Sequence, residues 1–353
     1  MRMRRDDADA DNRLDAAATR ILASPATRLL ADGIRVAWPV FLLGWFAWQT
    51  WHRISLFVTL NFPMGIDARI YYRGVLAWLH GGNPWNATVS AGGAAYHYAG
   101  SPVTTVILAP AGLVSEDAFT AIWLVVTWLS AVVILRRVHL PLWWLLFPPI
   151  SEALFSANPQ LVVLALLLAN RSWLAAVATG LKVYAFIPLF GEGRWRAIGV
   201  AVAFNAATIL VAPGLWARYV EEFGTISTRL AYESIFGFSA FYDPPLLALT
   251  AGALILLAVR DRRAAGWLAV PAVWPASQLH YSTMALPVMS PVLAFGLAVP
   301  ELRLPPVIIV IEVVRRLLAP PVARYLDRRR PGDPTAGPTA GPTAGPMATR
   351  TPD

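Results

Sequence analysis

The acidic residue best placed for chemistry is Asp67, which follows a long apolar run and opens a helical pattern. If residues 67–80 form a helix, Asp67, Tyr71, Gly74 and Trp78 share one face, at positions i, i+4, i+7 and i+11. Aromatic faces stack on the C–H groups of a sugar, and a carboxylate can accept a hydroxyl proton. This face predicts either a sugar platform with Asp67 as a base, or an interfacial helix with one solvated aspartate.

Basic side chains occur beside this face and again further along the chain. Arg69, Arg73 and His80 lie on a neighbouring face of the same predicted helix. Lys182 is the only lysine among the 29 Lys and Arg residues, and it lies inside the apolar segment 172–190. A buried ammonium group there either pairs with an anionic lipid phosphate or extends its head toward water.

A polar group also interrupts the apolar stretch 264–299, which we expect to form a hairpin of two membrane spans. Gln278, His280 and Tyr281 lie near the tip of that hairpin. Polar groups at membrane depth are costly unless they are used. His280 is therefore a candidate ligand-binding residue, and its alternative is a structural histidine that holds the hairpin together.

Asn158 and Gln160 break the chain between two apolar halves. They either bind a polar ligand or satisfy backbone groups that the break frees. The sequence has no cysteine, no P-loop, no dinucleotide fingerprint and no pair of histidines at metal-ligand spacing, so we expect neither a metal nor a cofactor. Carboxylates inside apolar segments are few, chiefly Glu152 and Glu312.

The composition indicates a membrane protein. Hydrophobic residues make up 57% of the chain and charged residues 14%, whereas soluble proteins carry roughly 25% charged residues. The net charge of +8 comes from arginines that cluster beside apolar runs, which is typical of cytoplasmic loops. The expected partner is therefore a lipid bilayer, and a nucleic acid is not expected.

These patterns predict an all-α polytopic membrane protein. Residues 1–35 form a cytoplasmic segment, and 36–318 form a transmembrane domain of about ten to twelve membrane segments. The long loops 61–101 and 217–243 are expected outside the cell. The tail 331–353 repeats Thr-Ala-Gly-Pro, and we expect it to be disordered.

The arginine clusters at the N-terminus and at 260–263 predict the orientation, because positive loops stay in the cytoplasm. The N-terminal cluster places Asp67 on the extracytoplasmic side, and the cluster at 260–263 independently places His280 on the same side. The short apolar run 102–114 either crosses the membrane with the span 118–135 or re-enters without crossing.

Taken in order, the motifs resemble those of the polyprenyl-phosphate-mannose-dependent mannosyltransferases of actinobacteria, family eighty-seven of the glycosyltransferases. The resemblance covers roughly residues 36–300. Its motifs are Asp67-x3-Tyr71, Gly82-Asn83-Pro84-Trp85, Tyr98-x3-Pro102, Asn158-x-Gln160 before a Leu-rich run, the lone Lys182, and His280-Tyr281.

The resemblance implies a multi-span helical bundle of the GT-C type, in the plasma membrane, with an extracytoplasmic active site. It implies a polyprenyl-phosphate-sugar donor, a glycolipid or cell-envelope glycan acceptor, and Asp67 as the base of an inverting displacement. His280 is the first choice to steady the departing phosphate. The expected substrate-binding residues are His280, Tyr281, Tyr71, Arg69, Arg73, Lys182 and Gln160.

Other functions stay open. A transporter or flippase would be expected to carry more intramembrane carboxylates and an inverted internal repeat, and the sequence has neither. A catalytically degenerate relative acting as a scaffold, and a transferase for arabinofuranose in place of mannose, are the remaining alternatives.

Overall fold

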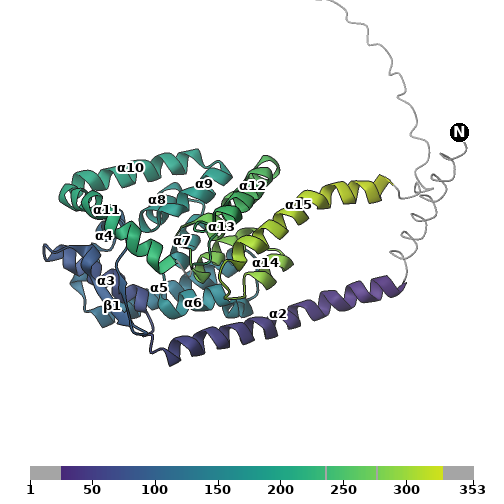
Figure 1. Cartoon of the computed structure of the whole chain (residues 1–353), viewed down its shortest axis with the longest axis horizontal. Coiled ribbons are helices and arrows are strands. Elements are labelled where there is room, and N and C mark those ends of the chain that lie inside the picture. The colour runs from purple at the N-terminus through teal and green to yellow at the C-terminus, as the bar shows by residue number, and fades with distance from the viewer. Residues whose placement is uncertain (1–24, 235–236, 276, 329–353) are drawn as a thin grey trace, which may run out of the picture. The chain divides into compact units, whose positions relative to one another are not determined.

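The computed structural model describes residues 25–234, 237–275 and 277–328, and the chain is helical through most of them (Figure 1). Within the described residues, the single exception to helix and loop is one two-stranded antiparallel sheet. These observations confirm the all-α part of the predicted fold. Most of the predicted cytoplasmic segment, residues 1–24, and the tail 331–353 lie outside the described residues.

Two compact units divide the chain. One unit consists of residues 1–35 and 317–353, of which the structure describes the start of helix α2 (Pro25–Thr59) and the end of helix α15 (Leu304–Arg328). The other unit, 36–316, holds all the remaining elements and every candidate site residue.

Helix α3 (Ile66–Leu79) confirms the predicted helix at Asp67. Gly65 precedes it in the left-handed conformation, with φ 76°, and donates its backbone N–H to the carbonyl of Phe155 at 2.8 Å. A side chain at Gly65 would be strained at this φ, and its Cβ would lie 2.6 Å from Thr120. A glycine is therefore required where the chain turns from α2 into the helix that carries Asp67.

A β-hairpin follows α3 in the predicted loop 61–101. The 3₁₀ segment η1 (Pro84–Asn86) leads into strands β1 (Thr88–Ala91) and β2 (Ala94–His97), which pair with Ala91 opposite Ala94. Gly92 and Gly93 both have positive φ, as a two-residue hairpin turn requires. The apolar run 102–114 then forms two short pieces, α4 (Pro102–Ile107) and η2 (Ala109–Leu113), each too short to cross a bilayer.

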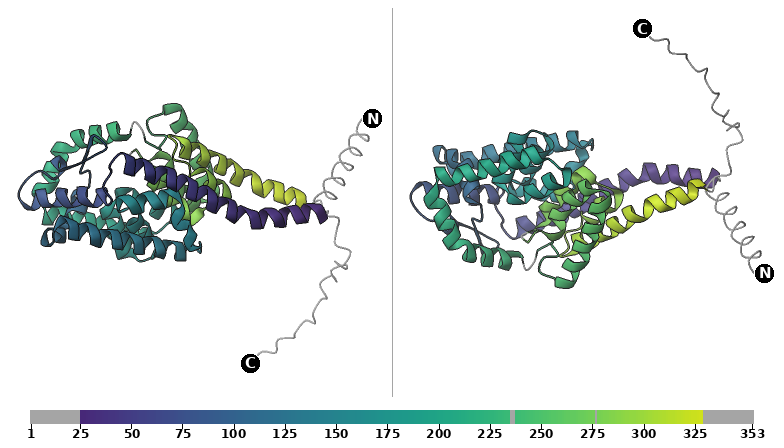
Figure 2. Two further views of the ribbon diagram at one scale, coloured as in Figure 1. Left: turned by 90° about the horizontal axis from the view of Figure 1, so that it is seen from below. Right: turned by 90° about the horizontal axis from the view of Figure 1, so that it is seen from above.

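The rest of the second unit consists of helices that pack against one another (Figure 2). Helix α5 packs on α3 and α7, α8 on α7 and α10, and α13 on α9, α12 and η5. These elements are α5 (Glu116–Arg137), η3 (Leu142–Leu146), α6 (Pro148–Ser156), α7 (Gln160–Leu168), α8 (Ser172–Leu181), η4 (Val183–Ala185), α9 (Phe186–Glu192), α10 (Trp195–Val211), α11 (Pro213–Ser234), α12 (Pro244–Arg260), α13 (Arg262–Val273), η5 (Leu279–Val288) and α14 (Pro291–Gly296).

Prolines overturn two predictions. The segment 264–299 does not form two long helices, because α13 ends at Val273, just before the Trp274-Pro275 step, and a proline disfavours the α conformation at the residue that precedes it. The remainder forms the 3₁₀ segment η5 and the short helix α14. The predicted loop 217–243 is also largely helical, since Pro213 ends α10 and begins α11.

The lengths and compositions of the helices indicate which of them could cross a membrane. Among the described residues, α5 alone is long and apolar enough to span a membrane as a single helix. Two bent pairs pass only when combined: α6 with α7, bent by 115°, and α10 with α11, bent by 102°. Counting each pair as one span gives up to three candidates in this part of the chain. The expected ten to twelve membrane segments stay a prediction.

Candidate functional site

One cavity brings together five of the predicted catalytic and substrate-binding residues. It encloses about 100 Å³, and its walls include side chains from α3, the β2 strand, the break before α7, the end of α8 and the start of η5. The five predicted residues that line it are Asp67, Tyr71, Lys182, His280 and Tyr281. We call this cavity the Asp67 pocket.

Asn158 holds the carboxylate of Asp67 in the pocket. Its Nδ2 donates to Asp67 Oδ2 at 2.7 Å, while its Oδ1 accepts from the backbone N–H of Gln160 at 2.9 Å. Ala157 adopts a left-handed conformation, with φ 55°, and ends helix α6, which turns the chain toward Asp67. The break between α6 and α7 therefore orients the acidic residue. The sequence signal for Asn158 was a polar residue between two apolar halves.

Lys182 lies between two aromatic rings of the pocket. Its Nζ is 5.7 Å from the ring centroid of Tyr71 and 5.8 Å from that of Tyr281, within the range of cation–π attraction. Among the described residues, no carboxylate forms an ion pair with Lys182. The pocket thus contains an ammonium group whose charge is available to an anionic ligand.

Tyr71 is buried on the same face of α3 as Asp67, as its spacing predicted. Burial raises the pKa of Tyr71 above its ordinary value of 10.0, and the nearby Lys182 offsets part of the rise. The phenol therefore keeps its proton near neutral pH and can donate a hydrogen bond. Its ring also packs edge-on against Tyr98, with the centroids 5.5 Å apart.

His280 lies in the 3₁₀ segment η5 and is buried, with 2% of its surface exposed, not at an open hairpin tip. Its Nδ1 is 3.2 Å from Glu152 Oε1, and Arg53 Nε donates to the other oxygen of Glu152 at 2.6 Å. Its Nε2 is buried without a hydrogen-bond partner in the described structure. Sequence reasoning noted Glu152 only as an intramembrane carboxylate and missed its contact with His280.

Gln160, predicted to bind substrate, does not line the pocket. It is fully buried, its Nε2 donates to Thr283 Oγ1 at 3.2 Å, and its Oε1 accepts from the hydroxyl of Tyr184. Tyr184 packs in turn against the ring of Tyr281, at 5.0 Å between centroids. Gln160 therefore supports the pocket wall from behind.

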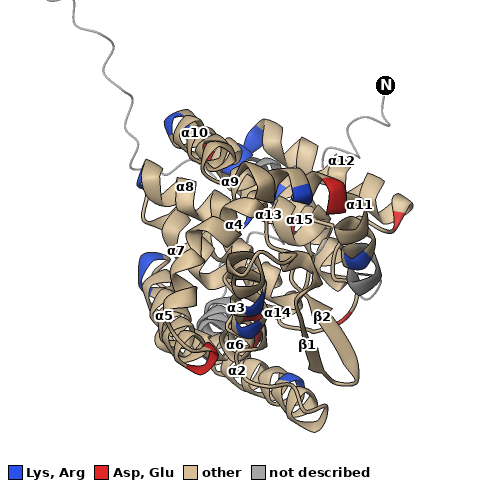
Figure 3. Cartoon of the chain, turned by 90° about the vertical axis from the view of Figure 1, so that its left-hand side faces the viewer, with Lys and Arg blue, Asp and Glu red and all other residues tan. Residues whose placement is uncertain are grey.

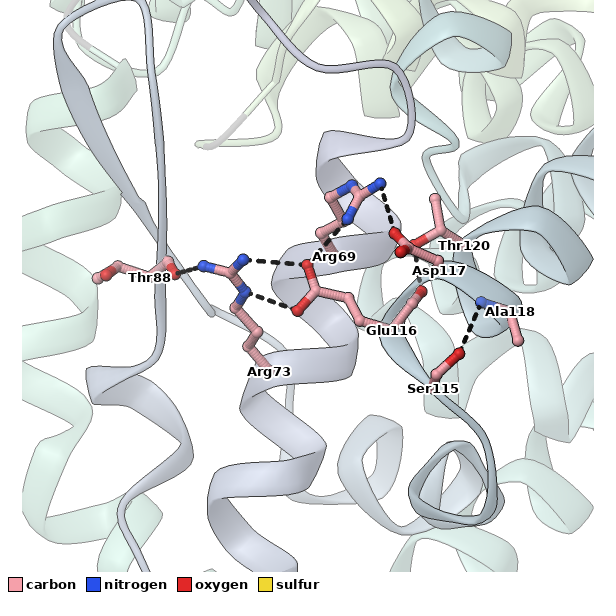
Figure 4. A network of polar contacts seen from close by, with 8 residues as sticks. All are labelled: Arg69, Arg73, Thr88, Ser115, Glu116, Asp117, Ala118 and Thr120. Atoms are coloured by element: carbon pink, nitrogen blue, oxygen red, sulfur yellow. Dashed lines mark hydrogen bonds and ion pairs between the residues drawn. The ribbon is translucent and has the colours of Figure 1, made fainter.

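Arg69 and Arg73, predicted to bind substrate, are instead paired with acidic residues outside the pocket (Figure 4). Arg73 donates to both oxygens of Glu116, and Arg69 bonds Glu116 at 3.1 Å and Asp117 at 3.0 Å. The reason is helical geometry, since these arginines lie on a different face of α3 from Asp67, and that face packs on α5.

This network shifts the pKa values of its members. Burial by itself would raise the pKa of Glu116, but hydrogen bonds from Arg73 and Arg69 outweigh burial and hold the pKa below its ordinary value. The hydrogen bond to Glu116 raises the pKa of Arg73. The arginine charges are thus neutralised locally.

Comparisons of the chain with models of known families, with curated proteins and with solved structures gave no match. Within the described residues, no group of three His, Asp or Glu side chains could hold a metal ion.

Proposed function

We propose that the chain is a plasma-membrane glycosyltransferase that moves a sugar, mannose in the first instance, from a polyprenyl-phosphate donor to a glycolipid or cell-envelope glycan on the extracytoplasmic face. The observation that carries the proposal is the shared pocket of Asp67, Lys182 and His280. A carboxylate that can accept a proton lies together with the ammonium group of Lys182 and with a histidine nitrogen that has no hydrogen-bond partner among the described residues. The acceptor hydroxyl requires a base, and the sugar phosphate requires a positive or hydrogen-bond-donating partner.

The reaction we propose is a single inverting displacement. The oxygen of the acceptor hydroxyl attacks the anomeric carbon while Asp67 takes the hydroxyl proton. The bond between that carbon and the phosphate oxygen breaks, and the polyprenyl phosphate leaves with the electron pair. Lys182 and His280 stabilise the negative charge on the departing phosphate. Phosphate is a good leaving group, so a single carboxylate base is sufficient.

The exposed surface supports a membrane setting. Apolar side chains on several helices lie open, among them Leu129 of α5 at 61%, Leu210 of α10 at 86% and Val259 of α12 at 83%. Charged residues are sparse on the described ribbon, most of which is tan in Figure 3. Exposed apolar faces of this kind are costly in water and favourable in lipid.

Asp67→Asn tests the proposal. The amide keeps the size of the side chain but cannot accept the proton, so transfer from polyprenyl-phosphate mannose to octyl mannoside should fall about 10²- to 10⁴-fold. Asp117→Asn is the matched control, because Asp117 is exposed and lies outside the pocket. Near-wild-type turnover by Asp67→Asn would remove Asp67 from catalysis, and absence of transfer by the wild-type protein would refute the function.

A further inference from the structure

Three side chains from distant parts of the chain form one contact series that ends at the Asp67 pocket. Arg53 of α2 donates to Glu152 of α6 at 2.6 Å, and the other oxygen of Glu152 lies 3.2 Å from His280 Nδ1. Glu152 and His280 are both almost completely buried, with 4% and 2% of their surfaces exposed. Each oxygen of the Glu152 carboxylate therefore has its own partner, Arg53 for one and His280 for the other.

The far end of the series lacks a partner. His280 lines the Asp67 pocket, and its Nε2 is buried without a hydrogen bond to any described residue. Buried polar atoms in proteins are nearly always hydrogen-bonded. Nε2 can therefore bond a group on a ligand that enters the pocket.

We propose that Glu152 is a positioning residue, which accepts the Nδ1–H hydrogen bond of His280 and so holds its Nε2–H toward a phosphate oxygen of the donor. The inference rests on the proposed function. A ring that donates through both nitrogens is an imidazolium. The same arrangement of a carboxylate behind a histidine orients metal-binding and catalytic imidazoles elsewhere.

Arg53 makes this use of Glu152 compatible with an anionic ligand. A bare carboxylate so close to the pocket would repel a phosphate group. Because the guanidinium of Arg53 compensates its charge, Glu152 can orient the imidazole without adding net negative charge beside the ligand. The competing explanation is that the series is a structural ion pair, which only ties α2, α6 and η5 together.

The ring nitrogens of His280 separate the two explanations. The full chain, with ¹⁵N-labelled histidine rings, is placed in lipid nanodiscs, and the His280→Ala variant identifies the His280 signals among the five histidines. We expect a protonated Nδ1 in the wild-type protein and a change in the Nε2 signal when polyprenyl phosphate is added. Glu152→Leu should shift the Nδ1 signal, whereas Glu152→Gln, which keeps an acceptor oxygen, should retain a protonated Nδ1.

Binding of polyprenyl phosphate gives the second readout. Glu152→Leu should lower the affinity about tenfold or more, as expected when a hydrogen bond to a charged group is lost. In the His280→Ala background the same substitution should have no further effect, because Glu152 acts through His280. Glu116→Leu is the matched control, since Glu116 is likewise an ion-paired carboxylate, held by Arg69 and Arg73, but lies outside the pocket. Its affinity should equal that of the wild-type protein.

Two results would overturn the assignment: unchanged His280 signals in Glu152→Leu, or losses of affinity that multiply in the double variant. If Glu152→Leu does not fold, Glu152→Gln decides the question, since loss of the protonated Nδ1 signal in that variant contradicts the positioning role. Failure of the wild-type protein to bind polyprenyl phosphate refutes the proposed function instead. In that case the nitrogen signals of the unliganded protein still decide whether Glu152 holds the ring.

Discussion

Replacing Gly74 by alanine should destabilise the protein and disturb the Asp67 pocket. Gly74 lies in the middle of α3 and faces the ring of Tyr98. A Cβ atom at this position would lie 2.4 Å from Cγ and 2.7 Å from Cδ1 of that ring, whereas ordinary carbon contacts are about 3.5–4.0 Å. The ring would therefore have to move.

The surroundings of Tyr98 make that movement costly. The ring is almost fully buried, its hydroxyl is 2.8 Å from Thr105 Oγ1, and its side packs against Tyr71. Overpacking of this kind costs about 1–3 kcal/mol, and the better helix propensity of alanine offsets about 0.5–1 kcal/mol. We expect a net loss of roughly 1–2 kcal/mol in the free energy of unfolding, within the range of these estimates.

Thermal unfolding of the purified protein in detergent measures this effect. A loss of that size should lower the melting temperature by a few degrees, at about 2–4 °C per kcal/mol. Gly224→Ala in α11 is the matched control, because a Cβ there meets no atom within 4 Å. Its stability should rise by up to about 1 kcal/mol. A Gly74→Ala protein as stable as the wild type would refute the packing argument.

Two further predictions concern topology and pH. Because the chain has no cysteine, Ser90→Cys and Gln278→Cys, both at exposed positions, should react with an impermeant thiol reagent in intact cells, and labelling only after permeabilisation would reverse the proposed orientation. Glu116→Gln should lower stability at pH 7 by about 1 kcal/mol, the scale of a partly exposed ion pair. Since the native pKa of Glu116 is depressed, its contribution is present above the ordinary value of 4.5 and is lost as pH falls through the lower native value. The difference in melting temperature between this variant and the wild type should vanish in acid, and a difference that persists there would contradict the assignment.

Local patterns in the sequence were sufficient to predict helix α3 and to place Asp67 and Tyr71 on the same face of it. Helical spacing is a local property, and glycines flank α3, with Gly65 before it and Gly81-Gly82 after it. The same reasoning failed where prolines occur inside apolar stretches. Helix α13 ends just before Pro275, within the segment that was expected to form a hairpin of two spans, and the 3₁₀ segment η5 follows, so His280 is buried and not at an exposed tip.

The sequence by itself determined the helical class, the apolar character of the chain and the small set of polar residues available for chemistry. Only the tertiary structure decided which of them meet. Glu152 and His280 are 128 positions apart, and Arg73 and Glu116 are 43 apart. Spacing along one helix assigns side chains to faces, but the partner of each face depends on where other helices bend and pack. For that reason Lys182 lies in the Asp67 pocket with no carboxylate partner in the described part of the chain, while the arginines of α3 are neutralised outside it.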